Sequence, residues 1–142
     1  IIAPHELQHI SDLQKQTDAL VYSNVNETNI LMNNVLIIDS IGFLSNIYQY
    51  ANIAYIGGGF GAGIHNILEA VAFGLPVIFG PNYQKFNEAK ELINQKGAIS
   101  ISNYKELTSA IDFFSAFDKS IAINYIQENS GATSKILDTI IT

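Results

Sequence analysis

Short apolar runs alternate with amphipathic stretches along this chain, a pattern typical of strands that alternate with helices. Val35–Ile38 and Ile53–Ile56 are continuous runs of β-branched residues with Leu, Ala and Tyr. Such runs are typical of strands buried on both faces, as in a parallel sheet. The same reasoning predicts four further strands, at Ile1–Ala3, Ala19–Tyr22, Pro76–Phe79 and Ala98–Ile101.

Helical spacing fills the intervals between these strands. In Glu6–Thr17, the apolar residues Leu7, Ile10 and Leu13 recur at helical intervals among polar ones. A further helix is predicted after Asp39-Ser40 and through Ile47–Tyr50. Four more are predicted over Ile64–Phe73, Phe86–Gln95, Tyr104–Phe117 and Ile121–Ile141. The last of them has a break near Ser130-Gly131. Ser23–Asn34 is rich in Asn, Ser and Thr and predicts a surface loop.

These elements predict an α/β fold with a Rossmann-like parallel sheet, helices on both of its faces and a helical C-terminus. With 142 residues, the chain is expected to form a single domain over 1–142. It starts without Met or a signal peptide, so we expect it to be a piece of a longer protein. No apolar run is long enough to predict a membrane span.

Composition narrows the function. The formal net charge is −6, and all seven basic residues are lysines. Nucleic acids and anionic lipids favour basic patches, so neither is an expected partner. Without Arg, a bound anion has to rely on backbone N–H groups, helix ends, His or Lys. Without Cys, no disulfide or thiolate metal site is expected.

The segment Tyr55–Gln84 holds the candidate chemistry. It contains seven of the ten glycines, and Glu69 is the only formally charged residue between Asp39 and Lys85. A strand that runs into Gly57-Gly58-Gly59 and then into a helix places N–H groups and the positive end of a helix dipole at the carboxyl edge of a sheet. Gly61 and Gly63 add conformational freedom there. This arrangement predicts an anion site.

Glu69 follows His65 and Asn66 by one helical turn in this prediction. Its carboxylate could accept two hydrogen bonds from a vicinal diol such as a ribose, while the preceding N–H groups hold a phosphate. The alternative is an acidic residue that only stabilises the first turn of a helix. The absence of any other charge nearby favours the nucleotide interpretation.

The other polar residues keep two interpretations each. His65 either binds ligand or is a polar cap, and Asn66 either contacts ligand or caps its own helix. His65 and Glu69 have no third partner for a metal site, and no HExxH pattern is present, so neither a metal nor another cofactor is expected. Asn82 and Tyr83 either line a cleft or form the turn after Pro81.

Known glycine motifs fit less well. The pattern Gly57-x-Gly59-x-x-Ala62 matches the dinucleotide fingerprint, but no acidic residue follows about 20 positions later. No Gly-Lys-Ser/Thr follows the glycines, which excludes a P-loop. Tight packing of strand, turn and helix would explain one or two of these glycines, but hardly five within seven positions.

Four blocks of the sequence resemble one enzyme family. They are Asp39-Ser40-Ile41-Gly42, the segment Tyr55–Gly61 (YIGGGFG), the segment Gly63–Ala70 (GIHNILEA) and the segment Pro76–Pro81 (PVIFGP). In this order and spacing they are similar to the C-terminal half of the 3-deoxy-D-manno-octulosonic acid (Kdo) transferases. The resemblance covers nearly the whole chain.

The resemblance implies the C-terminal half of a GT-B glycosyltransferase. That half holds the donor CMP-Kdo, whereas the N-terminal half supplies the catalytic carboxylate and docks the lipid A precursor at the cytoplasmic face of the bacterial inner membrane. This chain would therefore be the donor domain without its acceptor domain. It would contain no catalytic base and would be soluble and inactive by itself.

By position, Glu69 matches the family's ribose-binding acid, and Gly63–Asn66, with Ile64 and His65, matches the helix start that faces the donor phosphate. Asp39–Gly42 matches a loop near the base, where Ile41 and Gly42 would offer backbone contacts. Gly59 and Gly61 belong to the glycine turn.

The chain also departs from the family. Pro4-His5 lacks the Arg of the usual Pro-Arg-His, and Phe43 replaces a common acid. The candidates for the phosphate and the Kdo carboxylate are then His5, His65 and Lys85. Each of two candidates also has an interpretation without a ligand: His5 could cap the following helix, and Lys85 could be a solvated residue at the start of the next one. Two other functions stay open: a GT-B domain for a UDP- or GDP-sugar, and a non-catalytic Rossmann-like binding module.

Overall fold

The structure is a computed structural model that describes residues 1–4 and 7–131. The chain divides into two compact units, Ile1–Ile47 and Tyr48–Thr142. Each unit has its own parallel sheet, of two strands in the first and three in the second. The predicted parallel α/β architecture is therefore confirmed within each unit, whereas a single domain over 1–142 stays a prediction.

In the first unit, strands β1 (Leu20–Val21) and β2 (Leu36–Ile37) pair in parallel. The strand predicted at Ile1–Ala3 is reduced to a single parallel bridge from Ile2 to Ile37. The predicted helix begins with a 3-10 turn, η1 (Leu7–His9), and continues as α1 (Ile10–Thr17). Two short 3-10 turns, η2 (Tyr22–Asn24) and η3 (Ile30–Met32), lie in or next to the predicted surface loop.

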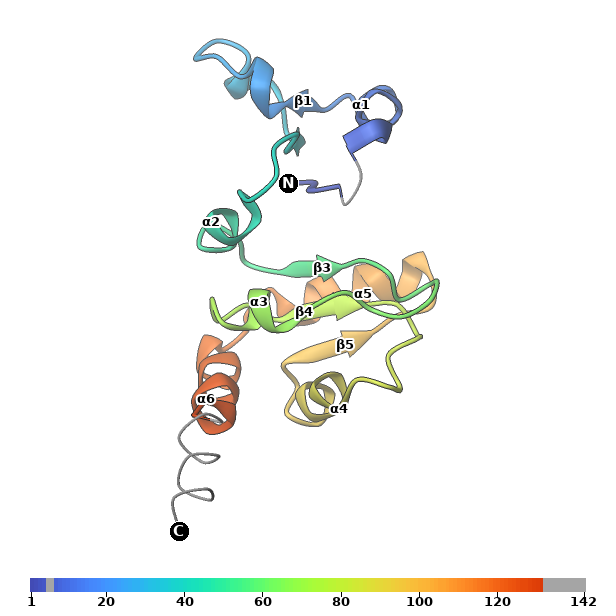
Figure 1. The fold of residues 1–142 in the computed structure, drawn as a ribbon, viewed down its shortest axis with the longest axis vertical. Helices are drawn as coiled ribbons and strands as arrows, with labels where there is room; N and C mark the ends of the chain where they lie inside the picture. Colours follow the sequence, from blue (N-terminus) through green and yellow to red (C-terminus); the bar gives the residue numbers. More distant parts are fainter. Residues whose placement is uncertain (5–6, 132–142) are drawn as a thin grey trace, which may run out of the picture. The chain divides into compact units, whose positions relative to one another are not determined.

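In the second unit, β3 (Ala54–Ile56), β4 (Val77–Phe79) and β5 (Ala98–Ser100) form a parallel sheet in the order β3-β4-β5 (Figure 1). Helix α2 (Leu44–Tyr48) spans the boundary between the units. The helices that follow are α3 (Leu68–Val71), α4 (Asn87–Asn94), α5 (Tyr104–Phe114) and α6 (Lys119–Asn129).

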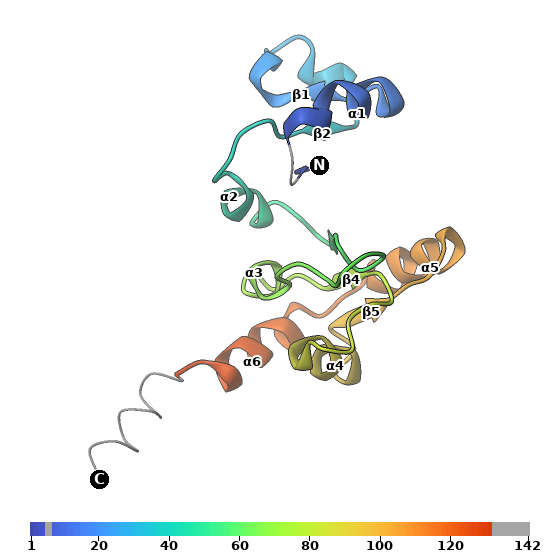
Figure 2. The ribbon, with the colours of Figure 1, turned by 45° about the vertical axis from the view of Figure 1, so that its right-hand side comes forward.

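Helices cover both faces of the three-stranded sheet, because β4 is apolar on both sides. Val77 and Phe79 pack into one cluster with residues of α3, α4 and α6. Ile78 points the other way, into a cluster with Ala110 and Phe114 of α5. All three strand residues are fully buried. Figure 2 shows α4 and α5 on opposite sides of these strands, as the continuous apolar run predicts.

The helix predicted over Ile64–Phe73 is wrong at its start. Gly63 has a φ of 146°, which is not helical, and regular helix begins only at Leu68. The His65 N–H donates to the Gly57 carbonyl, so the chain first returns to the end of β3 before it turns into α3. The predicted end is also wrong by two residues, because α3 ends at Val71; Gly74, whose φ is 75°, follows in the turn after the helix.

The backbones of Gly59 and Gly80 meet where β3 and β4 end. A Cβ on Gly59 would lie 2.6 Å from the Gly80 nitrogen, and one on Gly80 would lie 2.5 Å from the Gly59 carbonyl carbon. Real Cβ atoms do not approach backbone so closely. These two glycines are therefore required by packing alone.

Replacing Gly59 should test this contact. We expect Gly59→Ala to lower the free energy of unfolding by about 2 kcal/mol or more, because backbone has to move. Gly61→Ala is the matched control, since its nearest non-neighbouring atom would be 3.6 Å away; its cost should stay within about 0.5 kcal/mol. Urea unfolding measures both, and equal losses would contradict the packing argument.

A side-chain hydrogen bond joins α4 to α6. The Tyr125 hydroxyl donates to Glu91 Oε2 at 2.8 Å. Burial, and then the hydrogen bond and charge of Glu91, raise the pKa of Tyr125 above its ordinary value. A raised folded-state pKa stabilises the fold below the unfolded pKa of about 10, and this stabilisation is lost as the pH rises further.

The variant Tyr125→Phe should therefore lose about 1 kcal/mol of unfolding free energy at neutral pH. Above about pH 10, wild type should lose stability more steeply than the variant, so that the two curves converge. Urea unfolding from neutral pH to about pH 11 gives both curves. Parallel curves would show that the Tyr125–Glu91 pair carries no pH-dependent stability.

Candidate functional site

The glycine turn Gly57–Gly63 lies at the carboxyl edge of the three-stranded sheet, directly after β3. Several of its amides are already used. Gly61 N–H donates to the Gly58 carbonyl at 2.8 Å, and the Gly63 N–H reaches the same carbonyl at 3.4 Å. The His65 N–H donates to the Gly57 carbonyl at 3.0 Å. The predicted cluster of free N–H groups is thus smaller than expected.

Two glycines of this turn, Gly58 and Gly63, have a neighbour that leaves no room for a side chain. A Cβ on Gly58, whose φ is 86°, would lie 2.3 Å from the Gly63 carbonyl oxygen and 2.8 Å from the His65 ring. A Cβ on Gly63 would lie 3.0 Å from the Phe86 ring. Gly61 differs, because it is exposed and has room for a side chain. Of the turn glycines predicted for ligand contact, Gly61 is free of these packing demands.

Asn82 ties the turn to the segment after β4. Its N–H donates to the Gly59 carbonyl at 2.9 Å, and its side-chain Nδ2 donates to the Gly61 carbonyl at 2.8 Å. The sequence left two interpretations for Asn82, cleft lining and turn formation. These contacts support a structural role, because both hydrogen bonds hold the glycine turn. The position of Asn82 after Gly80-Pro81 indicated a turn, but the sequence could not show that Asn82 donates to the carbonyls of Gly59 and Gly61.

Glu69 and Asn66 are brought together. The Asn66 Nδ2 donates to Glu69 Oε1 at 2.9 Å, and Asn66 Oδ1 accepts the Leu68 N–H at 3.0 Å. Both residues are exposed. Helix α3 has four residues, so few peptide dipoles align, and the helix-dipole contribution that was predicted at Gly63–Asn66 is wrong. The exposed carboxylate is what this site offers to a ligand.

Sequence reasoning missed Tyr48, which lies close enough to Glu69 to sense its charge. Burial first, and then the negative charge of Glu69, raise the pKa of Tyr48 above its ordinary value. The Tyr48 ring is buried and packs against Phe73, with ring centroids 5.9 Å apart. A Tyr at the end of α2 carries no sequence signal for this neighbourhood.

The remaining predicted residues are divided between the two units. Ile64 is buried in the core of the second unit, with 5% of its surface exposed, and Lys85 is exposed just before α4. Ile41 is 89% exposed, and Gly42 has a φ of 88°; both lie in the first unit. His5 lies outside the described residues.

The first unit also shows how the Asp39 loop is held. The Ser23 N–H donates to Asp39 Oδ1 at 3.1 Å. Hydrogen bonds with Ser23 lower the pKa of Asp39 below its ordinary value. Asp39 is thereby an anion that organises the loop leading to Ile41 and Gly42.

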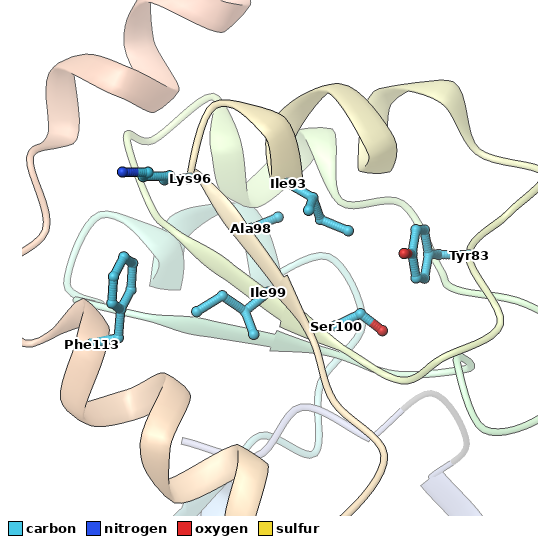
Figure 3. A pocket seen from close by; sticks show the side chains of 7 residues that line it. All are labelled: Tyr83, Ile93, Lys96, Ala98, Ile99, Ser100 and Phe113. Carbon is cyan, nitrogen blue, oxygen red and sulfur yellow. The ribbon is translucent and has the colours of Figure 1, made fainter.

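A separate hollow borders β5, and Tyr83 is the one residue singled out from the sequence that lines it (Figure 3). Its volume is about 330 Å³. Figure 3 shows Phe113 of α5 on one side and Ile93 of α4 on the other, with Ile99 of β5 between them and Ser100 on the side of Tyr83. Its lining is mostly apolar, and it lacks the carboxylate on which the nucleotide prediction depends.

Two further features concern membrane spans and metal ligands in the described part of the chain. None of the helices found in 1–4 and 7–131 is long and apolar enough to cross a membrane. In the same ranges, no three His, Asp or Glu side chains gather as metal ligands would.

Comparison with known proteins points to one family. No protein-family model matches the chain. A 3-deoxy-D-manno-octulosonic acid transferase of Rickettsia bellii is 35% identical over 118 residues, which are 80% of this chain and 28% of that protein. The enzyme of the same name from Aquifex aeolicus is 30% identical over 125 residues, or 87% of this chain and 35% of that protein.

A solved structure supports the fold. The C-terminal CMP-Kdo binding domain of WaaA from Acinetobacter baumannii superposes with a TM-score of 0.67 over 88% of this chain and 69% of that chain, at 17% identity. The chain spans between a quarter and about a third of the length of the two transferases above. The resemblance carried by the glycine and GIHNILEA motifs is thus confirmed: the chain is a relative of the Kdo transferases, and it has the fold of the C-terminal domain of WaaA.

Proposed function

We propose that this chain is the donor-binding part of a Kdo transferase and binds CMP-Kdo at the edge formed by Gly57–Glu69. The observation that carries the proposal is Glu69, the one carboxylate in a long uncharged segment, which is exposed in the short helix α3 after the glycine turn. A ribose diol can donate to it, and relatives of this chain bear the name of Kdo transferases.

The donor phosphate would lie over the glycine turn. A phosphate can approach the main chain closely at Gly61, because glycine has no side chain and, apart from its two chain neighbours, no protein atom lies within 3.6 Å of where a Cβ would be. His65 is exposed beside Gly57 and Gly58, and Lys85 is an exposed lysine just before α4. We assign His65 and Lys85 to the phosphate and the Kdo carboxylate, with His5 as a further candidate. Ile41 and Gly42 are proposed to contact the base.

The reaction proposed is an inverting transfer of Kdo to a lipid A precursor at the cytoplasmic face of the bacterial inner membrane. Remaining backbone N–H groups of the turn would stabilise the negative charge that develops on the departing CMP. The acceptor hydroxyl needs a general base, and no residue of this chain is assigned that role. The chain alone is therefore expected to bind nucleotide without transferring Kdo, and unaided turnover would contradict this.

A nucleotide titration tests the binding site. Adding CMP to ¹⁵N-labelled chain should shift the amides of Gly57–Ala70, with smaller shifts for UMP and GMP. Glu69→Ala should weaken CMP binding about tenfold or more, because hydrogen bonds to a charged group are lost. Stronger shifts with UMP or GMP would favour another nucleotide sugar, and unchanged CMP binding in Glu69→Ala would favour a non-catalytic module.

Gly61 separates packing from ligand approach. Gly61→Ala should weaken CMP binding about fivefold or more, since a methyl group would stand where the phosphate approaches. Its unfolding free energy should stay near that of wild type, because a Cβ on Gly61 would lie 3.6 Å from its nearest non-neighbouring atom. Thermal denaturation and calorimetric titration measure the two effects. Full CMP affinity in this variant would place the phosphate elsewhere.

A further inference from the structure

The sequence pattern Asn-x-x-Glu occurs at the start of two helices. Asn66-Ile67-Leu68-Glu69 leads into α3, and Asn103-Tyr104-Lys105-Glu106 leads into α5. In both, the Asn Nδ2 donates to Oε1 of the Glu, at 2.9 Å in the first and 2.8 Å in the second. The two pairs therefore provide an internal comparison.

At α5 the pair is closed. The Ser102 N–H donates to Glu106 Oε2 at 2.6 Å, and the Glu106 N–H donates to Asn103 Oδ1 at 3.0 Å. Both carboxylate oxygens of Glu106 thus accept hydrogen bonds from its own helix start. This arrangement resembles a capping box, and its role is structural.

At α3 the pair is open. His65 stands where Ser102 stands at α5, but the His65 N–H donates to the Gly57 carbonyl at 3.0 Å. Among the described hydrogen bonds, none reaches Glu69 Oε2. The Asn66 Oδ1 accepts the N–H of Leu68, two residues on, whereas Asn103 takes the N–H three residues on. The link from His65 to the end of β3 is what keeps Oε2 of Glu69 available.

We propose that Asn66 is a positioning residue, which holds the Glu69 carboxylate by Oε1 so that Oε2 faces a ligand diol. This inference rests on the proposed function, in which Glu69 binds the ribose. A free Glu side chain samples many rotamers, and fixing them beforehand removes part of the entropic cost of binding. Asn66 acts through Glu69 in this account and needs no contact with the nucleotide.

The test compares two ligands and two matched variants. Asn66→Ser keeps a side-chain oxygen that can accept the Leu68 N–H but removes the donor to Glu69. Asn103→Ser makes the same change at the closed pair. Each variant is titrated calorimetrically with CMP and with 2′,3′-dideoxycytidine monophosphate, which lacks the diol.

We expect Asn66→Ser to weaken CMP binding about fivefold and to leave binding of the dideoxy nucleotide unchanged. Asn103→Ser should change neither affinity, although it lowers the melting temperature. A merely structural role for Asn66 would weaken both ligands equally. Equal weakening, or none, would overturn the positioning role.

A double-mutant cycle separates this inference from the proposed function. Glu69→Gln should bring CMP affinity close to that of the dideoxy nucleotide, and adding Asn66→Ser to it should have no further effect. If Glu69→Gln does not distinguish the two ligands, ribose binding by Glu69 is wrong. If it does and Asn66→Ser still has its full effect in that background, only the positioning role is wrong.

A second variant covers the case in which Asn66→Ser does not fold. Asn66→Asp keeps the oxygen that accepts the Leu68 N–H and is as good a cap as Asn, but it has no donor for Glu69. It should show the same loss specific to CMP. Unchanged discrimination between the two ligands in a folded Asn66→Asp protein would also overturn the positioning role.

Discussion

The close approach of Gly59 to Gly80 determines the geometry of the second unit. Both glycines follow parallel strands, and their backbones meet at the carboxyl edge of the sheet with no room for a side chain. Asn82 reinforces the contact with two hydrogen bonds to the carbonyls of Gly59 and Gly61. The glycine turn is therefore supported from the strand beside it, and the segment that leads to Glu69 starts from a defined point.

From this contact the site follows step by step. The turn brings His65 back to the end of β3, where its N–H donates to Gly57. Asn66 then accepts the Leu68 N–H at the start of the four-residue helix α3 and donates to Oε1 of Glu69. Successive backbone and side-chain hydrogen bonds thus connect the end of β3 to the Glu69 carboxylate. A binding residue needs such support to keep its orientation.

Most of the elements of the fold could be predicted because their signals are local. The fully apolar run at Val77–Phe79 predicts a strand covered on both faces, and Phe79 and Ile78 do pack into different clusters. Local signals failed at Ile64–Ile67, whose apolar residues suited a helix. Those residues pack into the core without helix, because Gly63 and the His65–Gly57 hydrogen bond direct the chain otherwise.

By itself, the sequence determined the alternation of strands and helices, the isolation of Glu69 and the family to which the motifs point. Each depends on residue types at short spacing. Only the tertiary structure decided which glycines serve packing, that Tyr48 lies near Glu69, and that one Asn-x-x-Glu pair is closed while the other is open. These outcomes depend on which distant backbone atoms meet, and no local pattern specifies that.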